Sequence, residues 1–292
     1  MNNNTGLAEM VAKAVDARLK EEEERIDLSQ IERMTRQVLQ EIGGQAVKMA
    51  IALSQPKYVE PVTPCECGNE AKYVRQRKTK LHTMFGQIRV KRAYYLCAAC
   101  QSGGCPLDKQ LGLRPNALSA ELSRLVALTG VQLPFQKGCD LFKELTLVAV
   151  SDQTMGKASR QMGNRVAQQE EILKQKAVDP DYLGQQQREA KRPLRLYGAI
   201  DAAKVNIRAN KKEHGWRDLK LGAWFEARGQ PPTTPDGQWR IEADKIDYYV
   251  DISPAADFSL LVWATAVQRR AHLARELIIL GDGETENVKY FV

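Results

Sequence analysis

Apolar residues along the first fifty positions recur every three to four residues, which is the spacing of an amphipathic α-helix. One apolar face comprises Leu7, Met10, Val11 and Ala14, and a second comprises Ile31, Met34, Val38 and Ile42. The acidic run 21–25 and a capping residue at Asp27 or Ser29 separate the two patterns. The sequence therefore predicts two helices, which either mediate formation of a homo-oligomer or pack on their own protein.

Residues 71–96 change to the two-residue alternation of β-strands, and Phe85-Gly86-Gln87 divides them into a hairpin. Helical spacing returns beyond Pro115. The helical segments are 116–130, 134–146 and 150–175. The middle of the chain is thus predicted to be a hairpin followed by three helices.

The last hundred residues predict a mixed sheet. The predicted strands are 193–207, 216–227, 248–253 and the apolar run Leu277 to Leu280. A helix over 257–276 should turn Leu260, Ala264, Val267, Ala271 and Ala274 inward. The run Leu277 to Leu280 predicts a central strand covered on both faces. Three strands, a helix and a strand parallel to the first are the opening order of a ribonuclease-H-like sheet.

Two stretches rich in turn-forming residues mark boundaries, QPKYVEPVTP at 55–64 and VDPDYLGQQQREAKRP at 178–193. A chain of 292 residues fits two to four compact units. The predicted fold class is α+β and multidomain. Its parts are an N-terminal helical region (1–56), a zinc ribbon with a basic hairpin (57–114), a helix-turn-helix-like helical module (115–180) and the N-terminal part of an incomplete ribonuclease-H-like α/β domain (190–292).

Composition narrows the class of protein. A hydrophobic fraction of 43% and a charged fraction of 27% exclude wholesale disorder. The net charge of +7 suits a polyanionic partner such as nucleic acid. No signal peptide or membrane span is recognisable, so we expect a cytoplasmic protein without a membrane partner. In that reducing compartment, closely spaced cysteines indicate a metal site rather than disulfides.

Four cysteines form two close pairs, Cys65 with Cys67 and Cys97 with Cys100. Pairs of thiolates on two tight turns are what tetrahedral zinc needs, so the spacing predicts a structural zinc ribbon. The Cys-x-Cys-Gly spacer is shorter than usual, and Cys105 is an alternative fourth ligand. The competing interpretation is a set of unligated, partly buried thiols.

The strands between the cysteine pairs carry many cations. They are Arg75, Arg77, Lys78, Lys80, Arg89, Lys91 and Arg92. Alternation should put many of them on one face, where a flat basic ribbon can lie against DNA phosphates. A merely solvated face that protects a strand edge is the alternative.

The segment 150–175 has the pattern of a DNA-recognition helix. Ser151 is a plausible N-cap, and Met155, Ala158, Met162 and Val166 should be buried. The outward polar residues would be Gln153, Lys157, Arg160, Gln161 and Arg165. Such residues in the first half of a helix can reach base edges in the major groove, although three-helix modules are also common in purely structural roles.

Two carboxylates lie at predicted strand ends, Asp201 in YGAIDAAKV and Asp282 in LGDG. Side by side they could hold divalent metal for in-line attack on a phosphodiester, with ions about 3.5 to 4 Å apart. The alternative is that both aspartates only form turns.

The motifs TPCECG, YYLCAAC, PLDKQLGL, ALTGVQLPFQKGCDLF, GWRDLKLGAWFEA and LGDG follow one another along the chain, with the strand that ends in Asp201 among them. Together they resemble the ISKra group of bacterial insertion-sequence DDE transposases. The resemblance runs from about residue 60 to Gly283.

The resemblance implies DNA transposition, in which a ribonuclease-H-like core with three acidic metal ligands cuts and joins double-stranded DNA at insertion-sequence ends. It implies Asp201 and Asp282 as the first two catalytic acids, with magnesium or manganese as the cofactor. The third acid would follow Val292, so we expect a truncated and catalytically incomplete transposase. Glu284 and Glu286 lie too near Asp282 in the sequence to replace the third acid, which would come from a separate helix.

Two departures from the family pattern agree with that expectation. Asp-Ala-Ala at 201–203 replaces Asp-Gly-Thr, and ETENVKYFV replaces a tryptophan-rich segment. The alternative functions are a non-catalytic DNA-binding protein, such as a transposition inhibitor, and a zinc-stabilised dimerisation module without a nucleic-acid role. Salt dependence separates these alternatives, because phosphate contacts weaken steeply with salt.

Overall fold

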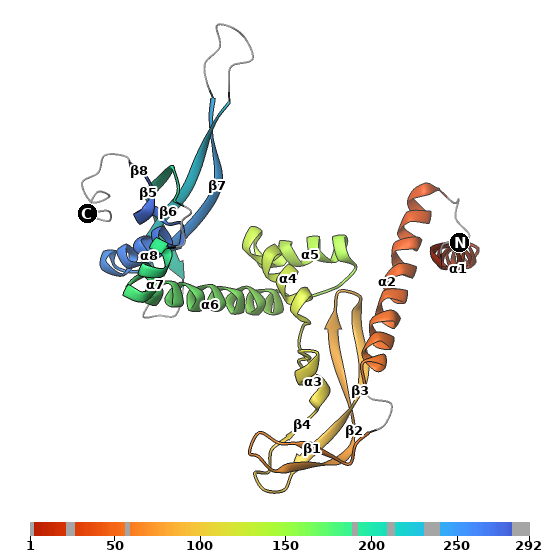
Figure 1. Cartoon of the computed structure of the whole chain (residues 1–292). Helices are drawn as coiled ribbons and strands as arrows, with labels where there is room; N and C mark the ends of the chain where they lie inside the picture. The colour runs from red at the N-terminus through yellow and green to blue at the C-terminus, as the bar shows by residue number, and fades with distance from the viewer. Residues whose placement is uncertain are drawn as a thin grey trace. The chain divides into compact units, whose positions relative to one another are not determined.

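The computed structural model describes residues 3–21, 27–55, 59–188, 192–208, 214–230 and 240–281. These residues form an α+β protein with eight α-helices and two four-stranded sheets (Figure 1). The chain divides into two compact units, Met1–Gly163 and Asn164–Val292. The division falls inside helix α6 (Asp152–Ala177), and the finer four-part division stays a prediction.

Helices α1 (Asn3–Leu19) and α2 (Leu28–Leu53) pack against each other. Their shared core contains Val11, Val15, Leu19, Met34 and Val38. Asp27 caps α2 in a reciprocal arrangement with Gln30, in which each side chain accepts a hydrogen bond from the other residue's backbone N–H. The predicted apolar faces therefore meet within one chain. Formation of a homo-oligomer stays a prediction.

The first sheet has the strand order β1-β2-β3-β4. Its strands are β1 (Val62–Pro64), β2 (Glu70–Thr83), β3 (Gly86–Cys97) and β4 (Gly103–Gly104). The long pair β2–β3 is the predicted hairpin, and Gly86 takes the positive φ of +85° that its tight turn requires. Helix α3 (Pro106–Gln110) follows β4.

Both edges of the hairpin are occupied near its turn. On the β2 side, the backbone N–H groups of Asn116 and Ser119 donate to the carbonyls of Lys80 and His82. On the β3 side, α2 lies along the strand (Figure 1). The shared apolar cluster contains Leu81, Ile88 and Val90, with Val47, Ile51 and Leu113 against it. The hairpin thus has no bare edge in this part, where an open edge would invite pairing with another chain.

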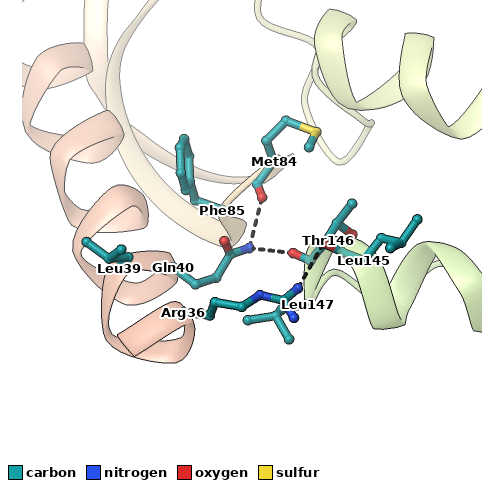
Figure 2. A pocket seen from close by; sticks show the side chains of 8 residues that line it. All are labelled: Arg36, Leu39, Gln40, Met84, Phe85, Leu145, Thr146 and Leu147. Carbon is teal, nitrogen blue, oxygen red and sulfur yellow. Dashed lines mark hydrogen bonds between the residues drawn. The ribbon is translucent and has the colours of Figure 1, made fainter. Parts of the chain in front are cut away.

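A polar clamp fixes α2 to the hairpin turn and to helix α5 (Phe135–Thr146) (Figure 2). Gln40 Nε2 donates to the carbonyl of Met84 at 2.9 Å and to that of Thr146 at 3.2 Å. Arg36 donates to the carbonyls of Glu144 and Leu145, which lie in the last turn of α5. Carbonyls at a helix end lack intrahelical donors, so α2 supplies the missing partners.

Three helices complete the first unit, α4 (Ala120–Gln132), α5 (Phe135–Thr146) and the first half of α6. Their core contains Leu122, Val126, Ala127, Cys139, Phe142, Val148, Met155 and Ala158. Gly138 lets α6 approach α5 closely, because a Cβ there would lie 2.8 Å from the sulfur of Met155. Ser151 accepts a hydrogen bond from the Thr154 N–H, as its predicted N-cap role requires.

The second unit contains a sheet of order β7-β6-β5-β8. Its elements after α6 are α7 (Pro180–Arg188), β5 (Arg195–Arg208), β6 (His214–Gln230), β7 (Arg240–Asp251), α8 (Ala255–Gln268), the 3-10 turn η1 (Ala271–Leu273) and β8 (Glu276–Leu280). Strands β5, β6 and β7 pair antiparallel, and β8 runs parallel to β5, as predicted. Helix α8 packs on one face of the sheet, where Trp224, Tyr249 and Phe258 are buried.

The predicted burial of β8 is wrong for the residues described. Within them β8 is an edge strand paired with β5 alone, and Leu277 and Leu280 are each 47% exposed. The core under α8 is built instead from β5, β6 and β7. Apolar composition indicated burial, but burial depends on which elements cover a strand.

Candidate metal centre and basic surfaces

A tight turn presents the first cysteine pair. The Gly68 N–H donates to the Cys65 carbonyl at 3.0 Å, and the Cys65 N–H donates to the Asn69 carbonyl at 2.8 Å. Gly68 has a φ of +85°, which glycine adopts without steric cost. This glycine explains how a single-residue spacer can aim Cys65 and Cys67 at the same point.

A second turn presents the other pair. The Cys97 N–H donates to the Ser102 carbonyl at 2.9 Å, and Gln101 closes the turn with a φ of +57°. Ala71 lies opposite Cys97 in the β2–β3 pairing, so the start of β2 and the end of β3 bring the turns together.

The four sulfurs form a compact cluster. Cys65 Sγ lies 3.6 Å from Cys100 Sγ, and Cys67 Sγ lies 3.7 Å from Cys97 Sγ. All four lie within 4.8 Å of one another and could hold a metal ion. The group does not include Cys105, which is buried beside Arg92 and Asp108.

Polar neighbours shift the pKa values of the cysteine thiols. The Asn69 amide donates to Cys67 Sγ at 3.5 Å, and this bond is the main cause that lowers the pKa of Cys67 to about 6. The backbone N–H of Cys100 lowers the pKa of Cys97, but burial and neighbouring thiols outweigh it, and that pKa rises to about 11. Ser102 Oγ lies 2.9 Å from Cys100 Sγ. The sequence reasoning did not single out Asn69 and Ser102, although each follows a cysteine by two residues.

Arg92 does not share the exposed basic face that was predicted for it. Its side chain is 6% exposed and forms an ion pair with Asp108 of α3. It lies opposite Arg77 in the pairing, on the side of the hairpin that also carries the buried Val90. Arg92 therefore attaches α3 to the hairpin, and its charge is already neutralised.

The other six predicted cations of the hairpin are exposed. They are Arg75, Arg77, Lys78, Lys80, Arg89 and Lys91. Lys78 lies directly opposite Lys91, and Lys80 lies opposite Arg89. In the described part of the chain, none of these four forms an ion pair. Like charges directly opposite on a sheet are destabilising, so this face carries an unneutralised positive charge.

Helix α6 separates its polar and apolar residues at its start. Gln153, Lys157 and Arg160 are exposed, whereas Met155 and Ala158 are buried against α4 and α5. The first turns of α6 thus present an amide, an ammonium and a guanidinium to solvent.

The predicted carboxylate pair is only partly described. Asp201 is exposed on β5, where its Oδ1 accepts a hydrogen bond from the Ala202 N–H at 2.7 Å. Asp282 lies outside the described residues, as do Glu284 and Glu286. Among the residues described, the four cysteines form the one cluster of metal-ligand type, and Asp201 is not in it. The parallel pairing of β5 and β8 ends at Ala199 and Leu280, each two residues before one of the predicted acids.

No described helix combines the length and the apolar character needed to cross a membrane. Neither a protein-family model nor a curated protein matches this chain.

Proposed function

We propose that the protein is a zinc-stabilised DNA-binding protein of transposase type. Zinc fits the cysteine cluster because Zn–S bonds of about 2.3 Å in a tetrahedron put neighbouring sulfurs about 3.8 Å apart. Two of the Sγ–Sγ separations here are 3.6 and 3.7 Å. Cys65, Cys67, Cys97 and Cys100 would hold the ion as a closed four-thiolate site, which is structural rather than catalytic.

The start of α6 carries the DNA-binding proposal. Helix α4, helix α5 and the start of α6 share one apolar core, and α6 would be the recognition helix of a helix-turn-helix. Gln153, Lys157 and Arg160 project from its exposed side. Gln and Arg can form bidentate hydrogen bonds to adenine and guanine edges, and Lys can pair with guanine or a phosphate.

The hairpin supplies the electrostatic part of the proposal. Its exposed cations would contact phosphates, which adds affinity without sequence preference. Arg77 also stacks on the ring of Tyr94, with its guanidinium carbon 4.6 Å from the ring centroid. The net charge of +7 favours the same class of partner.

The test is a binding measurement by fluorescence anisotropy, on duplexes selected from a random pool. Replacing Gln153, Lys157 and Arg160 together by Ala should weaken binding to the selected duplex by at least about 100-fold, since each good base contact contributes about 1–3 kcal/mol. Replacing Lys13, Arg33 and Gln37, which are exposed on α1 and α2, removes the same residue types and should change little. Equal losses in both triple variants would reject α6 as the recognition helix.

A second candidate function is metal-dependent cleavage of DNA. The parallel register of β5 and β8 supports it, because its last pair, Ala199 with Leu280, precedes Asp201 and Asp282 by two residues each in the sequence. Purified protein, bound duplex and Mg²⁺ or Mn²⁺ test the idea, with Asp201→Asn and Asp282→Asn as controls. Cleavage lost in both variants would support a catalytic transposase, and binding without cleavage would leave a DNA-binding protein such as a transposition inhibitor.

A further inference from the structure

A groove of about 590 Å³ lies between the C-terminal half of α2 and the hairpin. Four cations line it, Lys48 from α2 and Lys78, Arg89 and Lys91 from the hairpin. Gln55 and Gln76 add amide groups. The sequence singled out the three hairpin cations but not Lys48, which lies 30 residues earlier than Lys78 along the chain.

The groove is electropositive without internal compensation. Its lining contains no carboxylate, and within the described chain none of the four cations forms an ion pair. Lys78 and Lys91 lie directly opposite each other in the strand pairing, so two like charges are carried by neighbouring positions. A bound polyanion would turn this repulsion into attraction, since each cation would then face a phosphate.

The two walls of the groove are attached to each other. Gln55 Nε2 donates to the Lys91 carbonyl at 2.9 Å, and Ile51 packs on the cluster that contains Val90. The backbones that carry the four cations are therefore held in place before any ligand arrives. Such preorganisation lowers the entropic cost of binding.

The lining also limits the chemistry of the ligand. It contains no aromatic ring, so bases have nothing to stack on. A volume within the range of small-molecule sites, about 300–1,000 Å³, suits a short stretch of one strand. The cations and amides together match phosphate oxygens.

We propose that this groove binds the phosphodiester backbone of one nucleic-acid strand, and that Lys48 is a phosphate contact contributed by α2. The proposal rests on the DNA-binding function above and extends it to a helix outside the predicted DNA-binding residues. The strand belongs either to duplex DNA or to a free single strand, because both offer the same phosphate chemistry.

The test measures anisotropy of a labelled 30-nucleotide oligo(dT) and of a random 30-base-pair duplex, at several NaCl concentrations and with the full chain. Lys48→Ala should reduce the slope of log affinity against log salt by about 1, and Lys48→Glu should weaken binding about tenfold or more. Lys48→Arg should retain binding. Lys13→Glu, an equal charge change on exposed α1, should shift the affinity by less than about twofold.

Loss with oligo(dT) alone assigns the groove to a free single strand, and loss with the duplex assigns it to a strand of duplex DNA. If Lys48→Glu behaves like Lys13→Glu while the triple α6 variant loses binding, the groove proposal is wrong and the recognition helix stands. If Lys48→Glu weakens binding and the α6 variant does not, the groove stands and the recognition helix fails. A wild-type chain that binds neither probe nor any selected duplex would overturn both.

Discussion

At one end of the β2–β3 hairpin four sulfurs lie together, and at the other end a helix packs against the turn. The sulfur end has a small apolar core of Ala71, Tyr95 and Cys97. The turn end is covered by α2 on one side and bonded to residues 116–119 on the other. If the four sulfurs hold zinc as proposed, one strand pair is stabilised by metal ligation where apolar burial is small and by packing where it is larger.

Of the changes that would test this difference between the two ends, removing a metal ligand should have the largest effect on stability. We expect Cys97→Ser to abolish zinc binding and unfold the sulfur end, since structural Zn²⁺ sites contribute on the order of 10 kcal/mol to folding of small domains. Zinc analysis and hydrogen exchange would show lost metal and faster exchange in β1 and β4, with protection kept near Ile88 and Val90. Cys105→Ala is the matched control, because its thiol lies outside the cluster, and zinc loss in that variant would contradict the assigned ligand set.

At the turn end, the free energy of unfolding should depend instead on the volume of the packed side chains. A Cβ on Gly43 would overlap the ring of Phe85, so Gly43→Ala should destabilise the protein by about 1 kcal/mol, the overpacking cost exceeding the gain in helix propensity. In a Phe85→Ala background the same change should stabilise by about 0.5–1 kcal/mol, because only the propensity gain remains. Urea unfolding of the four proteins measures this coupling.

Gly163→Ala serves as the reference for helix propensity, because nothing lies within 4 Å of a Cβ at that position of α6. It should stabilise by about 0.5–1 kcal/mol in either background. If Gly43→Ala also stabilises the wild-type protein, the close packing of α2 on the turn is absent in solution.

Loss of the polar clamp should give a similar or smaller effect. Gln40→Leu leaves the Met84 and Thr146 carbonyls without this donor and should cost about 0.5–1 kcal/mol in free energy of unfolding. Gln37→Leu, an exposed position on the same helix, should cost less than about 0.5 kcal/mol. Equal values for the two variants would show that the clamp contributes nothing to stability.

The smallest expected effect comes from a pair of lysines between the two ends of the hairpin. Lys78→Glu replaces a like-charge pair with Lys91 by an attractive one and should stabilise the free protein by about 0.2–1 kcal/mol. The same variant should weaken DNA binding, because the groove loses a cation and gains an anion. Thermal unfolding would then show higher stability, while anisotropy would show weaker DNA binding. A loss of both stability and binding would mean that Lys78 supports the fold.

Local signals predicted much of this fold. Paired cysteines predicted the four-sulfur cluster, and changes of apolar spacing predicted the hairpin, the α-helices from α4 to α6 and the strand order of the second sheet. The face of the hairpin on which Arg92 lies could also be predicted from the sequence, whereas its burial under α3 could not. Gly86 opposite Thr83 fixes a register in which Arg92 faces Arg77, on the other side of the hairpin from Lys78 and Lys91.

Other features depend on contacts between distant parts of the chain. The exposure of β8 depends on which elements cover it, which its apolar composition does not encode. Lys48 joins the hairpin cations because α2 packs along β3, and helical spacing in α2 says nothing about that partner. Such placements need the tertiary structure.

The clamp on α2 has a consequence for the order in which the protein assembles. The Gln40 amide joins residues 44 and 106 positions further along the chain. During synthesis α2 would meet its first partner when the hairpin emerges and its second only after α5 has emerged, since domains form as their residues become available. The packing of the first unit is therefore completed late in synthesis. We expect that in a nascent chain ending before residue 146 the Gln40 amide lacks the Thr146 carbonyl that completes the docking of α2.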